Sequence, residues 1–206
     1  MTMNRNTLTI ASLVAAALVI ITGCSSSGGD QPTDSPTTPP SSSSSVISTP
    51  PADPSRAAID EATALIPKYL ETLDKLYNNP AVSLDGIHNV AIQPESTVEA
   101  VAIGKFRAGG YRGVGRTKLV STSAASAYLN GLGGSGPTAK SPAVKVTACV
   151  DVSGSGATDA KGKAVGDPKK AKYLLEKLTI VKVNFSGTIG WRVSNAPNSE
   201  ASSCGG

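Results

Sequence analysis

Cys24 is the residue with the clearest chemical assignment, because it ends the run Leu-Val-Ile-Ile-Thr-Gly-Cys at residues 18–24. The small side chains of Thr22 and Gly23 let a peptidase approach the backbone. The thiol of Cys24 is a nucleophile that can accept a diacylglyceryl group. This run is typical of a lipoprotein cleavage site. The alternatives are an ordinary signal peptide that happens to carry a cysteine and a membrane anchor that is never cut.

The segments on either side of Cys24 support secretion followed by anchoring. An apolar stretch at residues 8–21 follows a polar start with one basic side chain, Arg5, so we expect residues 1–23 to be a signal peptide. Residues 24–54 are rich in Ser, Thr and Pro and cannot bury enough apolar surface to order themselves. We therefore expect a disordered tether that holds one domain, residues 55–204, at the extracytoplasmic face of a cell membrane.

Two further cysteines, Cys149 and Cys204, remain once Cys24 is acylated. An even pair in an oxidising compartment predicts a disulfide, which would fix the C-terminus to the middle of the domain. The alternative is a pair of free thiols, one in a strand and one on the tail.

The supply of side chains for acid–base or metal chemistry is small. His88 is the only histidine, which excludes a histidine-pair metal site, and its place beside a turn favours a structural role over catalysis. Asp85 is expected to serve the same turn, and Asp151 and Glu176 could face either a cavity or solvent. No defensible carboxylate pair appears, so we expect no catalytic residue, no metal site and no cofactor.

Basic side chains interleaved with aromatic ones are concentrated at residues 105–118. The net charge of +4 is mild and an exported protein rarely meets nucleic acid, so no nucleic-acid partner is expected. The glycines here do not have the spacing of a phosphate-binding loop. The cluster is either a solvated face or a contact for anionic lipid headgroups or wall polymers. Its members are Lys105, Phe106, Arg107, Tyr111, Arg112, Arg116 and Lys118, with Arg107, Tyr111, Arg112 and Arg116 as candidate binding residues.

Helices are predicted in the first half of the domain. Apolar residues recur at helical spacing from residue 59 to residue 77, after a start signal at Asp53-Pro54, and Pro67 should kink this long helix. A second helix is expected to begin at Pro94 and to run through Val98, Val101, Ala102 and Phe106, with Gly109-Gly110 as its stop. Residues 84–88 should form a turn with a short extended piece.

Strands are predicted from Tyr111 onward, at residues 111–123, 143–153, 172–184 and 188–194, where Val, Ile, Thr and Tyr are frequent. In the second strand, valines and alanines alternate with polar residues, which predicts an antiparallel sheet with unlike faces. Trp191 is expected in the core. Residues 131–142 and 154–168 should be loops. The order predicts an α+β domain in which a kinked helix and a second helix pack on a curved antiparallel sheet.

This order resembles the nuclear transport factor 2-like (cystatin-like) family, and in particular small actinobacterial lipoproteins that carry such a domain behind a tether. The resemblance depends on the helix at residues 68–73, the strand at residues 144–151 and the closing segment at residues 190–193 with Cys204 behind it. It implies a conical hollow between helix and sheet, where similar folds such as ketosteroid isomerase and scytalone dehydratase place an acid–base pair.

The resulting expectation is a lipid-anchored cell-envelope lipoprotein whose domain binds a small apolar ligand or an envelope protein, or supports an envelope assembly, without catalysis. One alternative is an isomerase- or dehydratase-like enzyme that uses the hollow. Another is a surface exclusion or adhesion factor that acts by protein contact. A buried ionisable pair would favour the enzyme, and an exposed apolar patch would favour the adhesion factor.

Overall fold

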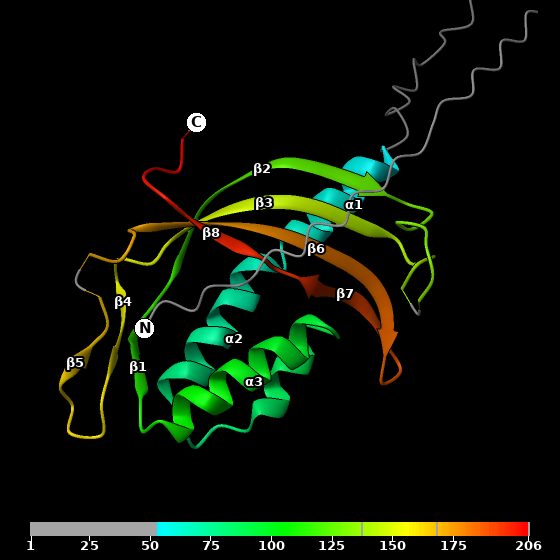
Figure 1. Ribbon diagram of the computed structural model, residues 1–206. Coiled ribbons are helices and arrows are strands. Elements are labelled where there is room, and N and C mark those ends of the chain that lie inside the picture. Colours follow the sequence, from blue (N-terminus) through cyan, green and yellow to red (C-terminus); the bar gives the residue numbers. More distant parts are fainter. Residues whose placement is uncertain (1–52, 137, 168, 206) are drawn as a thin grey trace, which may run out of the picture. The chain divides into compact units, whose positions relative to one another are not determined.

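The domain is an α+β structure in which helices pack on one curved antiparallel sheet, consistent with a nuclear transport factor 2-like fold (Figure 1). The computed structural model describes residues 53–136, 138–167 and 169–205. The elements are α1 (Pro54–Thr63), α2 (Ile66–Asn78), the 3-10 helix η1 (Leu84–Asn89), α3 (Glu95–Ala108), β1 (Arg112–Gly115), β2 (Lys118–Tyr128), β3 (Ala143–Asp151), β4 (Ser155–Thr158), β5 (Ala164–Val165), β6 (Tyr173–Phe185), β7 (Thr188–Asn195) and β8 (Asn198–Ala201).

The main sheet has the strand order β2-β3-β6-β7, with β8 also paired to β6. It arches over the helices, and α1 contacts β2, β3 and β7 (Figure 1). The predicted alternation in β3 is confirmed, because Val144, Val146 and Val150 are buried against the helices. Cys149 points to the opposite face and is buried there as well.

The strands differ from the prediction in three places. The single strand expected at residues 111–123 is divided into β1 and β2, because the chain turns at Gly115, whose φ of +79° an L side chain rarely adopts. The loop expected at residues 154–168 contains β4 and β5, which form a small second sheet with β1. The strand β8 was not predicted, since its sequence Asn-Ser-Glu-Ala carries no strand pattern.

The long kinked helix predicted at the start of the domain is in fact two helices. Helix α1 ends at Thr63 and α2 begins at Ile66, with Pro67 in the first turn of α2. Because proline has no backbone N–H, Pro67 cannot donate to the carbonyl of Thr63, four residues earlier, and the hydrogen-bond ladder ends there. Pro67 therefore starts a helix where the sequence predicted a kink inside one.

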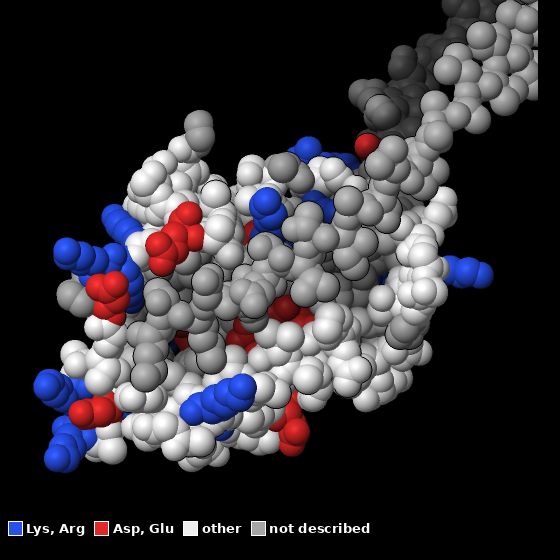
Figure 2. Space-filling view, viewed as in Figure 1, with Lys and Arg blue, Asp and Glu red and all other residues white. Residues whose placement is uncertain are grey.

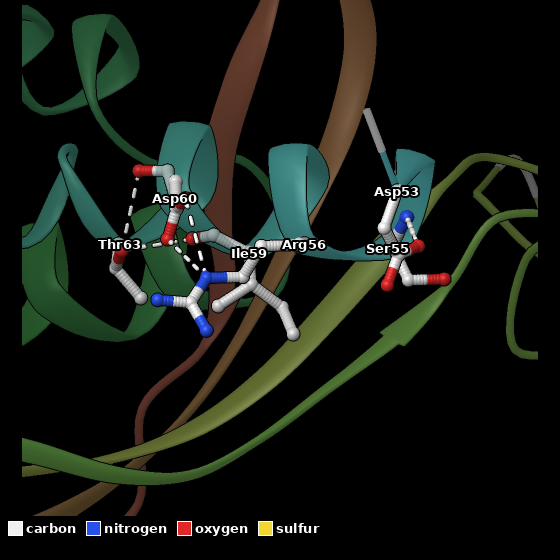
Figure 3. Close-up of polar contacts among 6 residues, drawn as sticks. All are labelled: Asp53, Ser55, Arg56, Ile59, Asp60 and Thr63. Atoms are coloured by element: carbon white, nitrogen blue, oxygen red, sulfur yellow. Dashed lines mark hydrogen bonds and ion pairs between the residues drawn. The ribbon is translucent and has the colours of Figure 1, made fainter. Parts of the chain in front are cut away.

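Side chains hold both ends of α1 (Figure 3). At the start, the Oδ1 atom of Asp53 accepts a hydrogen bond of 2.9 Å from the backbone N–H of Ser55, and Pro54 occupies the first turn. This is the predicted N-cap. At the end, the hydroxyl of Thr63 donates to the carbonyl of Ile59 at 2.8 Å, which satisfies an acceptor in the last turn.

Helix α3 begins after Pro94 and ends before Gly109, as predicted, but the two valines of the predicted apolar run are exposed. Val98 and Val101 are 39% and 49% exposed, whereas Ile103 is fully buried. The reason is that α3 packs against η1, α2 and β7, and Ile103 is on the side that these elements cover. The apolar pattern alone did not distinguish this side from the solvent side.

The core lies between α1, α2 and the concave face of the sheet. Trp191 is part of it, as predicted, and its indole Nε1 donates to Glu61 Oε2 on α1 at 3.0 Å. Lys182 also binds Glu61, at 2.8 Å, so one carboxylate joins α1 to two neighbouring strands. No helix among the described residues is both long and apolar enough to cross a membrane.

Candidate functional site

The predicted lipidation site lies outside the described residues, as do the signal peptide and most of the tether. The predicted disulfide is present. Cys149 on β3 and Cys204 behind β8 are joined, with a Cα–Cα distance of 5.5 Å. In the chain-entropy model, closing a loop of 55 residues stabilises the fold by about 4 kcal/mol.

Two of the four candidate binding residues, Arg107 and Arg112, hold the end of α2. The guanidinium of Arg107 donates to the carbonyls of Leu76 at 2.6 Å, Val82 at 2.8 Å and Asn79 at 3.0 Å. Arg112 donates through Nε to the carbonyl of Asn78 at 2.8 Å. These carbonyls lie at or just beyond the helix C-terminus, where a cation is favourable. The contacts of Arg107 are therefore mainly structural.

The other candidates lie nearer the surface. Arg116 lines a groove of about 630 Å³ beside α2, together with Arg112 and Asp74. Asp74 accepts hydrogen bonds from the backbone N–H and hydroxyl of Thr117, while burial raises the pKa of its carboxyl. Tyr111 is 41% exposed and packs on Phe106 with 5.7 Å between ring centroids. The structure thus brings Arg112 and Arg116 together in one groove, whereas Arg107 and Tyr111 are not among the residues that line it.

The segment around the single histidine is helical and differs from the predicted turn. Residues Leu84–Asn89 form the 3-10 helix η1, which Ser83 caps by accepting from the backbone N–H of Asp85 at 3.2 Å. The imidazole of His88 stacks on Phe185, with 6.0 Å between the ring centroids. Asp151 accepts from the backbone N–H and hydroxyl of Ser153, and these bonds lower its pKa.

Glu176 is in a different position. It lies on β6 in register with Ala148 of the core strand β3. Its side chain is on the same face of β6 as Leu178 and Ile180, which are buried, because alternate residues of a strand point the same way. The side chain therefore points to the concave face and is only 8% exposed. Its Oε2 atom is buried and has no hydrogen-bond partner among the described residues. A buried carboxylate oxygen without a donor is costly, so this atom needs an explanation.

Glu176 faces an acidic group contributed by the helices. Glu95, at the start of α3, is 4% exposed and accepts a hydrogen bond of 2.9 Å from the phenol of Tyr69 on α2. Its second oxygen accepts from the backbone N–H of Ala196, after β7, also at 2.9 Å. Glu99, one turn along α3, interacts with Glu176 and with Tyr77. We call Tyr69, Glu95, Glu99 and Glu176 the acidic site.

Burial controls the protonation of the acidic site. Burial first, and then the charges of Glu99 and Glu95, raise the pKa of Glu176 to about 7. Burial likewise raises the pKa of the Tyr69 phenol, with a further contribution from Glu95, so Tyr69 stays a neutral donor. On the face shown in Figure 2, acidic side chains are set back between the sheet and the helices. The site can therefore hold a proton, or accept a hydrogen bond or a positive charge, near neutral pH.

The sequence contained a signal for this site. Glu176, Leu178 and Ile180 are alternate residues of one strand, which places Glu176 on the apolar face of β6. Tyr69 was already part of the apolar pattern of the predicted helix. Glu95 was interpreted only as favourable to a helix start, because its contacts with Tyr69 and Ala196 are distant in sequence. Within the described ranges, no group of three or more His, Cys, Asp or Glu side chains is arranged to hold a metal ion.

Comparisons with known proteins give little further information. No protein-family model and no curated protein matches the chain. Among solved structures, the chain is similar to the intermembrane space region of the chloroplast protein ARC6, with 9% sequence identity and a TM-score of 0.45. That similarity covers 69% of this chain and 97% of the ARC6 chain.

Proposed function

We propose that this protein is a lipid-anchored cell-envelope protein, acylated at Cys24, whose domain binds a ligand at the acidic site without catalysing a reaction. The lipoprotein-type cleavage sequence at residues 18–24 supports the anchor. The Cys149–Cys204 disulfide is compatible with an oxidising compartment outside the cytoplasm.

The observation that carries the binding proposal is the buried Oε2 atom of Glu176, which no donor in the described residues satisfies. Glu95 is different, because both of its oxygens have donors in the fold. A ligand with an N–H donor would supply the bond that Glu176 lacks. Since Leu178 and the core valines lie beside it, we propose a small, mostly apolar ligand with one amine or other N–H group.

The test compares amines with their neutral isosteres. The full chain in neutral detergent is titrated with aryl- and alkylamines and with the matching alcohols, at about pH 8, where Glu176 is ionised. We expect the wild type to bind at least one amine more tightly than its alcohol. Glu176→Gln should abolish this preference, while Glu200→Gln, an exposed Glu→Gln change on β8, should keep it. Equal binding of amine and alcohol by the wild type would contradict the proposal.

A second candidate is the isomerase- or dehydratase-like enzyme. It is favoured by the burial of two ionisable groups, Glu95 and Glu176, in one site. The raised pKa of Glu176, about 7, suits a group that both accepts and returns a proton. Under this alternative, Glu176 would be the acid–base group and the neutral phenol of Tyr69 a nearby donor. Turnover of an amine-free carbonyl compound by the wild type, lost in Glu176→Gln, would favour the enzyme over the binding domain.

A further inference from the structure

A second groove, of about 660 Å³, lies between α2, η1 and the hairpin of β6 and β7. Its α2 side is a single stripe, since residues 65, 68, 72, 75 and 76 repeat at helical spacing. The opposite wall comes from the hairpin, where Ser186 and Gly187 turn with φ angles of 51° and 83°. We call this the basic groove; it is lined by Leu65, Lys68, Thr72, Lys75, Leu76, Val82, Gly86, Asn89, Phe185, Ser186, Thr188 and Arg192.

The charge of the basic groove is of one sign. Lys68, Lys75 and Arg192 line it, and no Asp or Glu does. The two ion pairs found among the described residues, Arg56–Asp60 and Lys182–Glu61, involve none of these three cations. Among the described residues, none of these three cations therefore forms an ion pair with a carboxylate, although Lys75 also lines the first groove together with Glu71 and Asp74. A concave wall concentrates the positive charge.

The guanidinium of Arg192 is held in place. Its Nε donates to the carbonyl of His88 at 3.3 Å, and one terminal nitrogen donates to the carbonyl of Trp191 at 2.8 Å. These bonds fix the guanidinium plane, so little entropy remains to be lost when another acceptor binds. The two lysines differ, because each carries three rotatable donors on a flexible stem.

Other groups in the groove suit a ligand larger than a single ion. Ser186 and Thr188 supply hydroxyls, whereas the hydroxyl of Thr72 already donates to the carbonyl of Lys68 at 2.8 Å. Val82 and Phe185 supply apolar surface. Phe185 is 38% exposed and is backed by the His88 ring.

We propose that the basic groove binds a phosphate-bearing molecule with an apolar part. A tetrahedral phosphate carries several acceptor oxygens, which two ammonium groups, one guanidinium and the hydroxyls can share, whereas a planar carboxylate uses fewer donors. The apolar part would lie on Val82 and Phe185. The same phosphate chemistry occurs in a lipid headgroup and in a soluble phosphate ester, and the experiment distinguishes them. This proposal does not depend on the acidic site.

The experiment measures binding to the full chain in neutral detergent micelles. Glycerol 1-phosphate is the soluble probe, and phosphatidylglycerol doped into the micelles is the lipid probe. We expect saturable binding of at least one of them, weakened by at least about tenfold in Lys68→Gln/Lys75→Gln. A matched double variant, Lys161→Gln/Lys177→Gln, removes two exposed lysines outside the groove and should bind as the wild type does.

The outcomes are all decisive. Binding of glycerol 1-phosphate identifies a soluble ligand class, and binding of phosphatidylglycerol alone identifies a lipid headgroup. Glu176→Gln should leave the phosphate affinity unchanged, which separates this site from the acidic site. No binding of either probe, or an equal loss in the two double lysine variants, would overturn the proposal.

Discussion

Glu176→Gln should change the pH dependence of stability, because the neutral amide has nearly the shape of the carboxyl but cannot ionise. In the folded protein the pKa of Glu176 is about 7, against 4.5 for an unperturbed group. Between these pH values the folded state keeps a proton that the unfolded chain has released. The free energy of unfolding of the wild type therefore falls as the pH rises through this window, by about 3 kcal/mol in total, and is constant above it.

The variant lacks this loss. At pH 4.5 the free energy of unfolding of Glu176→Gln should lie within about 1 kcal/mol of the wild-type value. At pH 8 the variant should be more stable than the wild type by about 3 kcal/mol, which is equivalent to about 6–12 °C in Tm for a domain of this size. The facing groups, Glu95 and Glu99 on α3 and Tyr69 on α2, are present in both proteins, so the difference between the two reports the removal of the Glu176 carboxyl and of its interactions with them.

Denaturant unfolding at several pH values, with the disulfide intact, measures this difference directly. Glu200→Gln is the control, since this exposed glutamate should give a curve parallel to that of the wild type. Parallel curves for Glu176→Gln and the wild type would refute the reasoning, because they would show that Glu176 is not a desolvated acid.

Three further predictions concern other parts of the chain. Cys204→Ala, which opens the loop to Cys149, should lower the free energy of unfolding by about 4 kcal/mol, and denaturant unfolding with and without reductant checks it, because reductant should affect only the wild type. Arg107→Ala leaves the part-buried carbonyls of Leu76 and Val82 at the end of α2 without this donor and should cost about 2–3 kcal/mol, whereas Arg112→Ala, with one exposed contact, should cost about 1 kcal/mol or less; equal losses in Tm would contradict the difference. Cys24→Ala should leave an uncut or soluble product on membrane fractionation, and unchanged cleavage and membrane retention would contradict acylation.

The local parts of the fold were predictable from sequence because short-range physics determines them. The cap at Asp53, the start of α3 at Pro94 and the alternation in β3 each depend on neighbouring residues. The break at Pro67 was located but misjudged, since the choice between a kink and two helices depends on how the second segment packs.

The candidate site was less predictable because its contacts are distant in sequence. Arg107 looked like a surface cation, and only the approach of α3 to the end of α2 reveals its carbonyl acceptors, 25 to 31 residues away. Glu95 and Tyr69 are 26 residues apart, and Glu176 joins them only when β6 lies across the helices. An acidic residue at a core position of a strand is the feature that could have indicated the site.

Native mass spectrometry of the full chain, extracted from the membranes of its host in neutral detergent, tests the proposed function most directly. We predict a mature protein that begins at an acylated Cys24 and carries a small bound molecule, which is absent from Glu176→Gln and retained by Glu200→Gln. An unacylated Cys24 would contradict the account, and so would wild-type protein that, like Glu176→Gln, carries no bound molecule.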